Sequence, residues 1–126
     1  MTKPKTALAY IELPAFDFDA AEQFYSSLFS WEFISYGEQY LAFKSGLCEG
    51  GFYKSTLVSS SKQGAALPIL QTDTLDALAL EVSQSAGAVT KSIFYFPGGR
   101  RFHFTDPHGN ELAVWSPKDR DGSMIK

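Results

Sequence analysis

The sequence predicts an α+β fold made of two βαβββ modules that pack into one domain. Apolar residues recur at helical spacing twice, in residues 17–30 and 75–87, and each helix follows one strand-like run and precedes three others. Two candidate helix-capping residues, Asp17 and Asp73, occupy matching places 56 residues apart. A half of about 50 residues cannot bury its sheet alone. We therefore expect two curved mixed sheets around a shared concave space, the cup.

The first module begins with an apolar strand over residues 7–13, which Pro14 is expected to end. Asp17 or Asp19 then caps a helix of about three turns. Three strands complete the module, over residues 31–36, 39–44 and about 49–54. The first module thus spans about residues 7–54.

A linker rich in Ser, Gly and Ala, residues 55–66, separates the modules. The second module, about residues 67–116, repeats the order of the first. Asp73 or Thr74 caps its helix, which is expected to end at Gly87. Its strands are expected over residues 67–72, 88–96, 100–105 and 110–115, with a loop at 97–99.

The composition argues against several classes of partner. With 44% hydrophobic and 20% charged residues, the 126-residue chain is typical of one soluble globular domain. A net charge of −3 gives no electrostatic reason to bind nucleic acid. The apolar stretch near the start is broken by Glu12, and no run reaches membrane-spanning length. We expect a cytoplasmic protein without a nucleic-acid or membrane partner, and the single Cys48 agrees with a reducing compartment.

A well-specified turn stands near the end of the chain, at Asp106-Pro107-His108-Gly109. Asp at the first corner, Pro with its fixed φ and Gly at a left-handed position suit a type I turn followed by a left-handed residue. The turn joins the last two strands as a hairpin. Within it, His108 is expected to be exposed to solvent.

The two βαβββ halves, the Phe24-Tyr25 pair in the first helix and the DPHGN segment before the last strand resemble the vicinal oxygen chelate superfamily. This superfamily includes glyoxalase I, extradiol dioxygenases, fosfomycin-resistance transferases and bleomycin-resistance proteins. The resemblance covers about residues 7–116, and YIELPAFDFDAAEQFYSSLFSWEF looks like the small glyoxalase-related proteins of bacteria. It implies a glyoxalase-like domain with a ligand in the cup and a C₂ homodimer.

The resemblance also implies metal ligands, His or Glu, on the first and last strands of each module. The matching positions hold Tyr10, Leu67 or Ile69, Ala113, and Gly51 or Phe52 with Glu49 nearby. Alanine cannot ligate, and tyrosine is a poor ligand for divalent ions. The only histidines, His103 and His108, are expected to lie far apart. We therefore predict no metal and no other cofactor.

Six residues are predicted to bind a small molecule: Tyr10, Glu12, Phe52, Arg101, His103 and Trp115. The aromatic residues would form walls, and Arg101 would contact an anionic or carbonyl group, as at equivalent positions of fosfomycin-type relatives. His103 would hydrogen-bond the ligand or transfer a proton. A charged Glu12 within an apolar strand is costly unless it is paired or faces a wet cavity, and Arg101 or His103 is its predicted partner.

Three functions remain open at this point. The first is a metal-independent binding protein of the bleomycin-resistance kind. The second is an enzyme, a lactoylglutathione lyase-related lyase or a dioxygenase, that holds a metal through Glu12, His103 and a further residue in a shifted register. The third is a structural or partner-binding domain without a small ligand.

Overall fold

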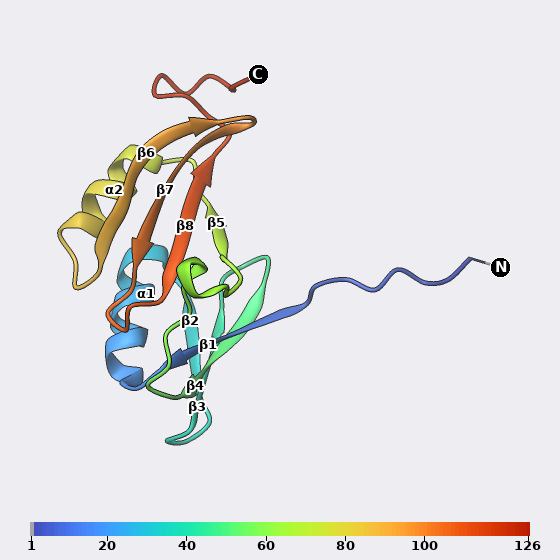
Figure 1. Cartoon of the computed structure of the whole chain (residues 1–126), viewed down its shortest axis with the longest axis vertical. Helices are drawn as coiled ribbons and strands as arrows, with labels where there is room; N and C mark the ends of the chain where they lie inside the picture. The colour runs from blue at the N-terminus through green and yellow to red at the C-terminus, as the bar shows by residue number, and fades with distance from the viewer. Residues whose placement is uncertain (1) are drawn as a thin grey trace.

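Both modules have the predicted βαβββ order in the computed structural model, which describes residues 2–126 (Figure 1). The first module contains β1 (Tyr10–Ala15), α1 (Phe18–Phe29), β2 (Glu32–Ser35), β3 (Tyr40–Lys44) and β4 (Glu49–Lys54). The second contains β5 (Ile69–Gln71), α2 (Leu75–Ser83), β6 (Ala88–Phe96), β7 (Gly99–Thr105) and β8 (Glu111–Ser116). A short 3₁₀ helix, η1 (Ser61–Gln63), lies in the linker.

The two sheets have equivalent topologies. The strand order is β1-β4-β3-β2 in the first and β5-β8-β7-β6 in the second. In each, the module's first and last strands pair in parallel, and the remaining pairs are antiparallel. The sheets are therefore mixed, and they do not close into one barrel. Figure 1 shows α1 and α2 on the same side of the molecule, so each sheet has one helix-facing side and one opposite side.

Strand β1 begins and ends later than predicted. It starts at Tyr10 because its only neighbour, β4, starts at Glu49, the register partner of Tyr10. The strand also continues through Pro14, which pairs with Tyr53. The prediction that Pro14 ends the strand is wrong, since β1 lies at a sheet edge and an edge strand can accommodate a proline.

Helix α1 begins as predicted, whereas α2 ends early. The Asp17 side chain accepts a hydrogen bond from the Ala20 backbone N–H at 3.1 Å, which caps α1. Helix α2 ends at Ser83 and not at Gly87. The hydroxyls of Ser83 and Ser85 donate to backbone carbonyls of the last turn, so they compete with its continuation.

One core joins the two modules, and α1 lies at its centre. Tyr25 of α1 is fully buried, and its ring stacks on Trp31 with centroids 4.7 Å apart. The ring of Phe24, the neighbouring helical residue, packs against that of Phe104 of β7 in the second module, with ring centroids 6.0 Å apart. Because the same helix covers residues of both sheets, neither module has a separate core.

The Asp106–Asn110 turn fastens the modules together. Asp106 is buried and accepts hydrogen bonds from the Tyr25 hydroxyl at 2.7 Å and from two backbone N–H groups of its own turn. The Asn110 side chain donates to the Pro14 carbonyl at 2.7 Å. These two side chains therefore hydrogen-bond the end of the second module to α1 and β1 of the first.

His108 is buried, so the prediction of an exposed side chain is wrong. Its Nε2 accepts a hydrogen bond from the Asp17 backbone N–H at 3.1 Å, and its ring packs edge-on against Phe16. The turn faces α1 of the other module and not solvent. An acceptor Nε2 means that the ring proton is on Nδ1.

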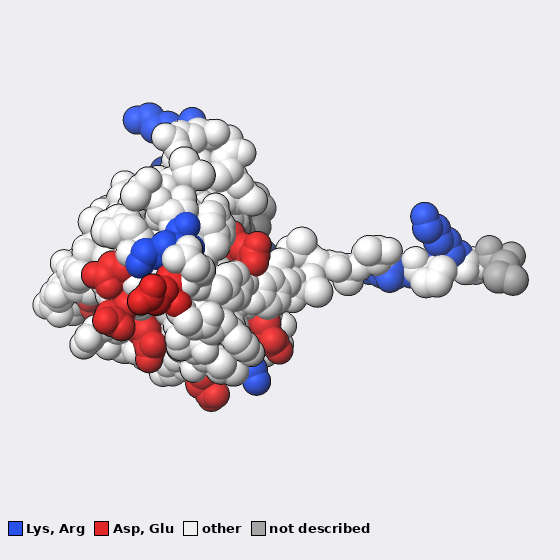
Figure 2. All heavy atoms as spheres, turned by 90° about the horizontal axis from the view of Figure 1, so that it is seen from below, with Lys and Arg blue, Asp and Glu red and all other residues white. Residues whose placement is uncertain are grey.

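The segment before β1, residues 2–9, extends away from the body of the molecule and is exposed (Figure 1). Figure 2 shows Asp and Glu side chains gathered on the face seen from below, and Lys side chains on the extended segment. Within residues 2–126 no helix is long and apolar enough to cross a membrane.

Candidate functional site

Three of the predicted residues share one face of the second sheet. Arg101 pairs with Trp115, and His103 pairs with Ala113, so all four side chains project to the same side. Their strand neighbours Phe102 and Val114 point the other way and are fully buried in the core. The side opposite the helices, which we call the Arg101 face, therefore carries the polar side chains that sequence alternation predicted.

Arg101 is set between aromatic rings. Its guanidinium carbon lies 5.2 Å from the ring centroid of Phe94 and 5.3 Å from that of Phe96, within cation–π range. The Nε atom is buried and has no hydrogen-bond partner among residues 2–126. Lys91 Nζ lies 5.1 Å from the centroid of the same Phe94 ring.

Neither Lys91 nor Arg101 forms an ion pair within the described chain. Adjacent Arg100 is different, because both its terminal nitrogens donate to Asp76, at 3.1 and 3.0 Å, and its Nε donates to the Lys118 carbonyl. Arg100 thus holds α2 against β7, whereas Arg101 keeps its positive charge available. A partly buried guanidinium without an ion-pair partner among residues 2–126 favours an anion.

His103 is oriented by Glu111. Its Nδ1 lies 3.0 Å from Glu111 Oε2, and its Nε2 is buried without a partner among residues 2–126. The other carboxylate oxygen accepts from the Ser61 backbone N–H at 2.9 Å and from its hydroxyl at 2.6 Å. These hydrogen bonds from Ser61, and then the one from His103, lower the pKa of Glu111 to about 2.

With Glu111 ionised, the shared hydrogen bond needs its proton on His103 Nδ1. The unpartnered Nε2 is then directed away from Glu111, as in a base oriented by a carboxylate. Such a nitrogen can hydrogen-bond a ligand or accept a proton from it.

The first-module residues form a separate cluster. The Tyr10 and Tyr40 hydroxyls lie 2.7 Å apart, and Tyr40 donates to Glu12 Oε2 at 2.8 Å. Burial, followed by these hydrogen bonds, raises the pKa of Tyr40. Glu12 is exposed and its partner is Tyr40, so the predicted pairing of Glu12 with Arg101 or His103 is wrong. No hydrogen bond or ion pair within residues 2–126 connects this cluster to the Arg101 face.

Phe52 belongs to the core and not to a ligand-binding face. It is fully buried, and its ring lies 5.4 Å from that of Tyr25 on the helix-facing side. Gly51 is the residue of β4 that lies beside Glu12. A Cβ at Gly51 would collide with the Tyr40 ring, so glycine lets the Tyr10–Tyr40–Glu12 cluster form.

Sequence reasoning missed several members of both clusters, namely Tyr40, Ser61, Lys91, Phe94 and Phe96. The two phenylalanines carried a weak signal, because they alternate at the end of strand 88–96. Lys91 carried none, since register shifts in β6 bring it to the same side as Phe94, three residues further on.

The residues present do not fit the metal site that the fold implies. Ile69 and Ala113 face each other across the β5–β8 pair, and neither can ligate an ion. His103 and Glu111 supply only two donor groups, and one Glu111 oxygen is already bound by Ser61. Within residues 2–126 there is no cluster of three or more His, Cys, Asp or Glu side chains suited to a metal.

Comparison with known proteins identifies relatives of the whole domain. A family model described as the Glyoxalase/Bleomycin resistance protein/Dioxygenase superfamily matches residues 7–114. No match was found among curated proteins.

Solved structures with the same fold cover nearly the whole chain. A glyoxalase-related enzyme from Fulvimarina pelagi superposes with a TM-score of 0.72 at 16% identity, over 97% of this chain and 99% of that chain. A lactoylglutathione lyase from Agrobacterium tumefaciens gives 0.67 at 23% identity, over 90% and 95%. A glyoxalase/bleomycin resistance protein/dioxygenase family enzyme from Burkholderia phytofirmans PsJN gives 0.72 at 16% identity, over 86% and 96%. These low identities show a shared fold and not a shared chemistry.

Proposed function

Because the chain belongs to the Glyoxalase/Bleomycin resistance protein/Dioxygenase superfamily, we propose that it binds a small anionic molecule on the Arg101 face, without a metal ion. The observation that carries this proposal is the buried Nε of Arg101, which has no partner within residues 2–126. A buried donor without an acceptor costs free energy, and a carboxylate or similar anion would remove that cost.

The surrounding side chains define the shape of the ligand. Phe94, Phe96 and Trp115 offer ring surfaces beside the guanidinium, so an aromatic or amphipathic body suits the site. His103 Nε2 would contact a second polar group of the ligand. The ligand class is therefore a ring-bearing organic anion.

We further propose that a second copy of the chain completes the binding site. In one chain, the Tyr10–Tyr40–Glu12 cluster and the Arg101 face belong to different sheets and share no polar contact within residues 2–126. A C₂ homodimer could bring the cluster of one copy to the Arg101 face of the other, where both would line the cup.

Isothermal titration calorimetry with 2-naphthoate tests the anion site. We expect Arg101→Met to weaken binding about tenfold or more, because a charge-assisted hydrogen bond is lost while the aliphatic stem remains. Arg120→Met, which removes an exposed arginine of the C-terminal segment, should leave affinity unchanged. Equal affinity of the wild type and Arg101→Met would reject the anion site.

A metal-dependent lyase or dioxygenase is the second candidate, and the orientation of His103 by Glu111 is the observation in its favour. Elemental analysis of protein purified without chelator separates the two. We expect substoichiometric divalent metal. A stoichiometric metal ion that is lost in Glu12→Ala or His103→Ala would contradict the metal-free proposal and support the enzyme.

A further inference from the structure

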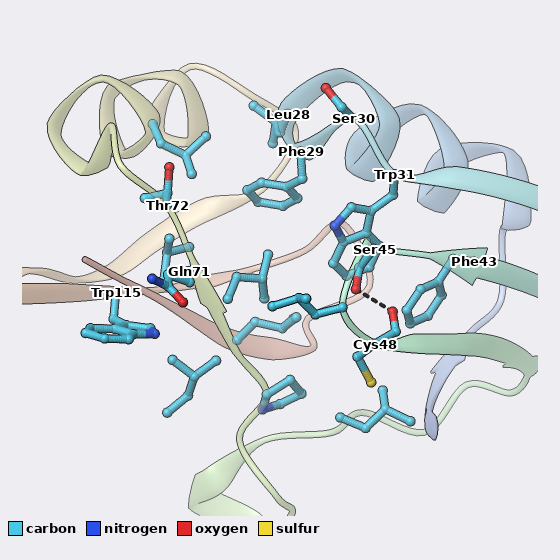
Figure 3. A pocket seen from close by; sticks show the side chains of 18 of the residues that line it. Leu28, Phe29, Ser30, Trp31, Phe43, Ser45, Cys48, Gln71, Thr72 and Trp115 are labelled. Carbon is cyan, nitrogen blue, oxygen red and sulfur yellow. Dashed lines mark hydrogen bonds between the residues drawn. The ribbon is translucent and has the colours of Figure 1, made fainter. Parts of the chain in front are cut away.

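A cavity of about 820 Å³ lies between the two modules (Figure 3). Part of its lining comes from the helix-facing sides of the sheets and from α1, including Leu13, Phe29, Phe43, Leu70 and Val114, and the remainder comes from α2, the linker and neighbouring loops. Leu13 alternates with Glu12 along β1, and Val114 alternates with Trp115 along β8. Arg101 and His103 do not line the cavity, whereas Trp115 borders both sites.

Trp31 supplies one of the polar groups of this cavity. It is 9% exposed, and its ring is stacked between those of Tyr25 at 4.7 Å and Phe43 at 4.6 Å. Its indole N–H makes no hydrogen bond within residues 2–126, and the nitrogen keeps accessible surface although most of the side chain is buried. Figure 3 shows the ring nitrogen on the side that faces Phe29 and the cavity, away from Phe43.

The charge of the lining restricts the occupant. Glu81 is the only charged residue among the lining side chains, and the remainder are mainly aliphatic and aromatic. Burying an anion here would be costly, since no positive charge lines the cavity, and Glu81 itself is exposed to solvent. The volume is within the range of small-molecule sites in proteins, which are mostly apolar with a few fixed polar groups.

We propose that this cavity is a second binding site, which takes a neutral ring-bearing molecule whose carbonyl or ether oxygen accepts a hydrogen bond from Trp31 Nε1. Phe29 and the edge of Trp31 provide aromatic surface for the ring, since the faces of Trp31 are covered by Tyr25 and Phe43. The oxygen would accept a hydrogen bond from an indole N–H that no protein group within residues 2–126 pairs with. The site is distinct from the anion site, because Arg101 and His103 do not line it and no positive charge does, although Trp115 borders both.

Nuclear magnetic resonance of the indole N–H groups tests the proposal. The chain has two tryptophans, so a ¹H–¹⁵N spectrum shows two indole signals, and Trp115→Phe assigns the Trp31 signal. The probes are 2-acetylnaphthalene, which carries a carbonyl acceptor, and 2-isopropylnaphthalene, which has the same shape without one. We expect the ketone to move the Trp31 proton downfield and to bind about three to ten times more tightly than the hydrocarbon.

Matched variants locate the binding. Thr72→Phe places a ring at the border of the cavity and should abolish binding of both probes, whereas Thr90→Phe, at an exposed position of β6, should not. Arg101→Met should weaken 2-naphthoate and leave 2-acetylnaphthalene unchanged, so failure of one site is distinguishable from failure of the other.

Three results would overturn the inference. A Trp31 signal that the ketone leaves unmoved, or that both probes move equally, would show that no hydrogen bond forms between Trp31 and the carbonyl. A Trp31 signal that responds to protein concentration and not to either probe would assign the cavity to a second copy of the chain.

Discussion

Ser61 of the linker and His103 of β7 together hold the Glu111 carboxylate in its ionised form, with a pKa of about 2 against an ordinary value of 4.5. Because the pKa of Glu111 is lower in the folded state than in the unfolded state, the ionised carboxylate stabilises the folded protein at pH values above the unfolded-state pKa. This stabilisation is lost as the pH falls from about 4.5 through about 2. One side chain therefore joins the linker to the candidate site and makes stability sensitive to acid.

We expect Glu111→Gln to lower the free energy of unfolding at pH 7 by on the order of 2 kcal/mol, and to flatten its dependence on pH below about 4.5. Urea denaturation followed by tryptophan fluorescence at several pH values measures both effects. Glu22→Gln, on the exposed side of α1, is the control and should keep the wild-type slope. If the free energy of unfolding of Glu111→Gln depends on pH below about 4.5 as that of the wild type does, these hydrogen bonds do not stabilise the fold.

Arg100 and Arg101 show how adjacent residues of one type acquire different roles. Strand alternation sends Arg100 to the helix side, where Asp76 neutralises it, and Arg101 to the opposite side, where aromatic rings surround it. The pairing with Asp76 raises the pKa of Arg100. Of the two, Arg101 is the one without an ion-pair partner among residues 2–126.

At the scale of elements, the β7–β8 turn connects the modules. Its Asp106 carboxylate accepts four hydrogen bonds, from the Tyr25 hydroxyl, the His108 N–H, the Asn110 N–H and the Asn110 side chain. Removing a buried acceptor leaves several donors unsatisfied at once. The turn therefore stabilises the interface between the modules as well as its own hairpin.

We expect Asp106→Ala to reduce the free energy of unfolding by about 3 kcal/mol, because buried donors lose their acceptor. Denaturant unfolding measures this change, and Asp121→Ala, at an exposed position, should change stability by less than about 0.5 kcal/mol. A loss of under about 1 kcal/mol in Asp106→Ala would mean that water replaces the carboxylate and that the turn contributes little to module packing.

The irregularity of β6 shapes the candidate site. The strand has register shifts between Val89 and Lys91 and between Lys91 and Phe94. As a result, Lys91 and Phe94 lie on the same side of the strand although they are three residues apart. A regular strand would have placed Lys91 and Phe94 on opposite faces. The cationic and aromatic character of the Arg101 face therefore depends on the bulge.

At the scale of the whole molecule, the exposed segment 2–9 and the strand edges are surfaces that the second copy proposed above would cover. Strands β1 and β5 each have a single neighbour, so each leaves one edge unpaired in the described chain. Leu8, next to β1, is 86% exposed. Lys3 and Lys5 give this segment positive charge, and an acidic face of the body is visible in Figure 2. Open edges and exposed apolar residues are commonly covered by a partner.

We therefore expect light scattering to give the mass of two copies at working concentration. Deleting residues 2–9 should raise the dimer dissociation constant, since the exposed Leu8 and the two lysines are removed. Lys3→Ala with Lys5→Ala tests the charge contribution, and high salt should reproduce its effect. A wild-type protein that remains monomeric would reject the homodimer, and with it the proposal that a second copy completes the cup.

Much of this molecule followed from local sequence patterns. The βαβββ order, the Asp17 cap and the turn at residues 106–109 could be predicted, because periodicity, capping and turn chemistry involve residues a few positions apart. Alternation also predicted that Arg101, His103 and Trp115 share a face. These features belong to single elements or to a hairpin whose register its own turn fixes.

The tertiary structure decided what depends on contacts between distant segments. Phe52 entered the core because β4 pairs with β1 in a register that no local pattern specifies. His108 is buried because its turn packs against the start of α1 in the other module. Glu12 accepts a hydrogen bond from Tyr40, and not from Arg101, because the two strands that carry Glu12 and Tyr40 lie in the same sheet. The physical reason is that local propensity acts along the chain, whereas strand register and module packing are set by the burial of side chains that lie far apart in sequence.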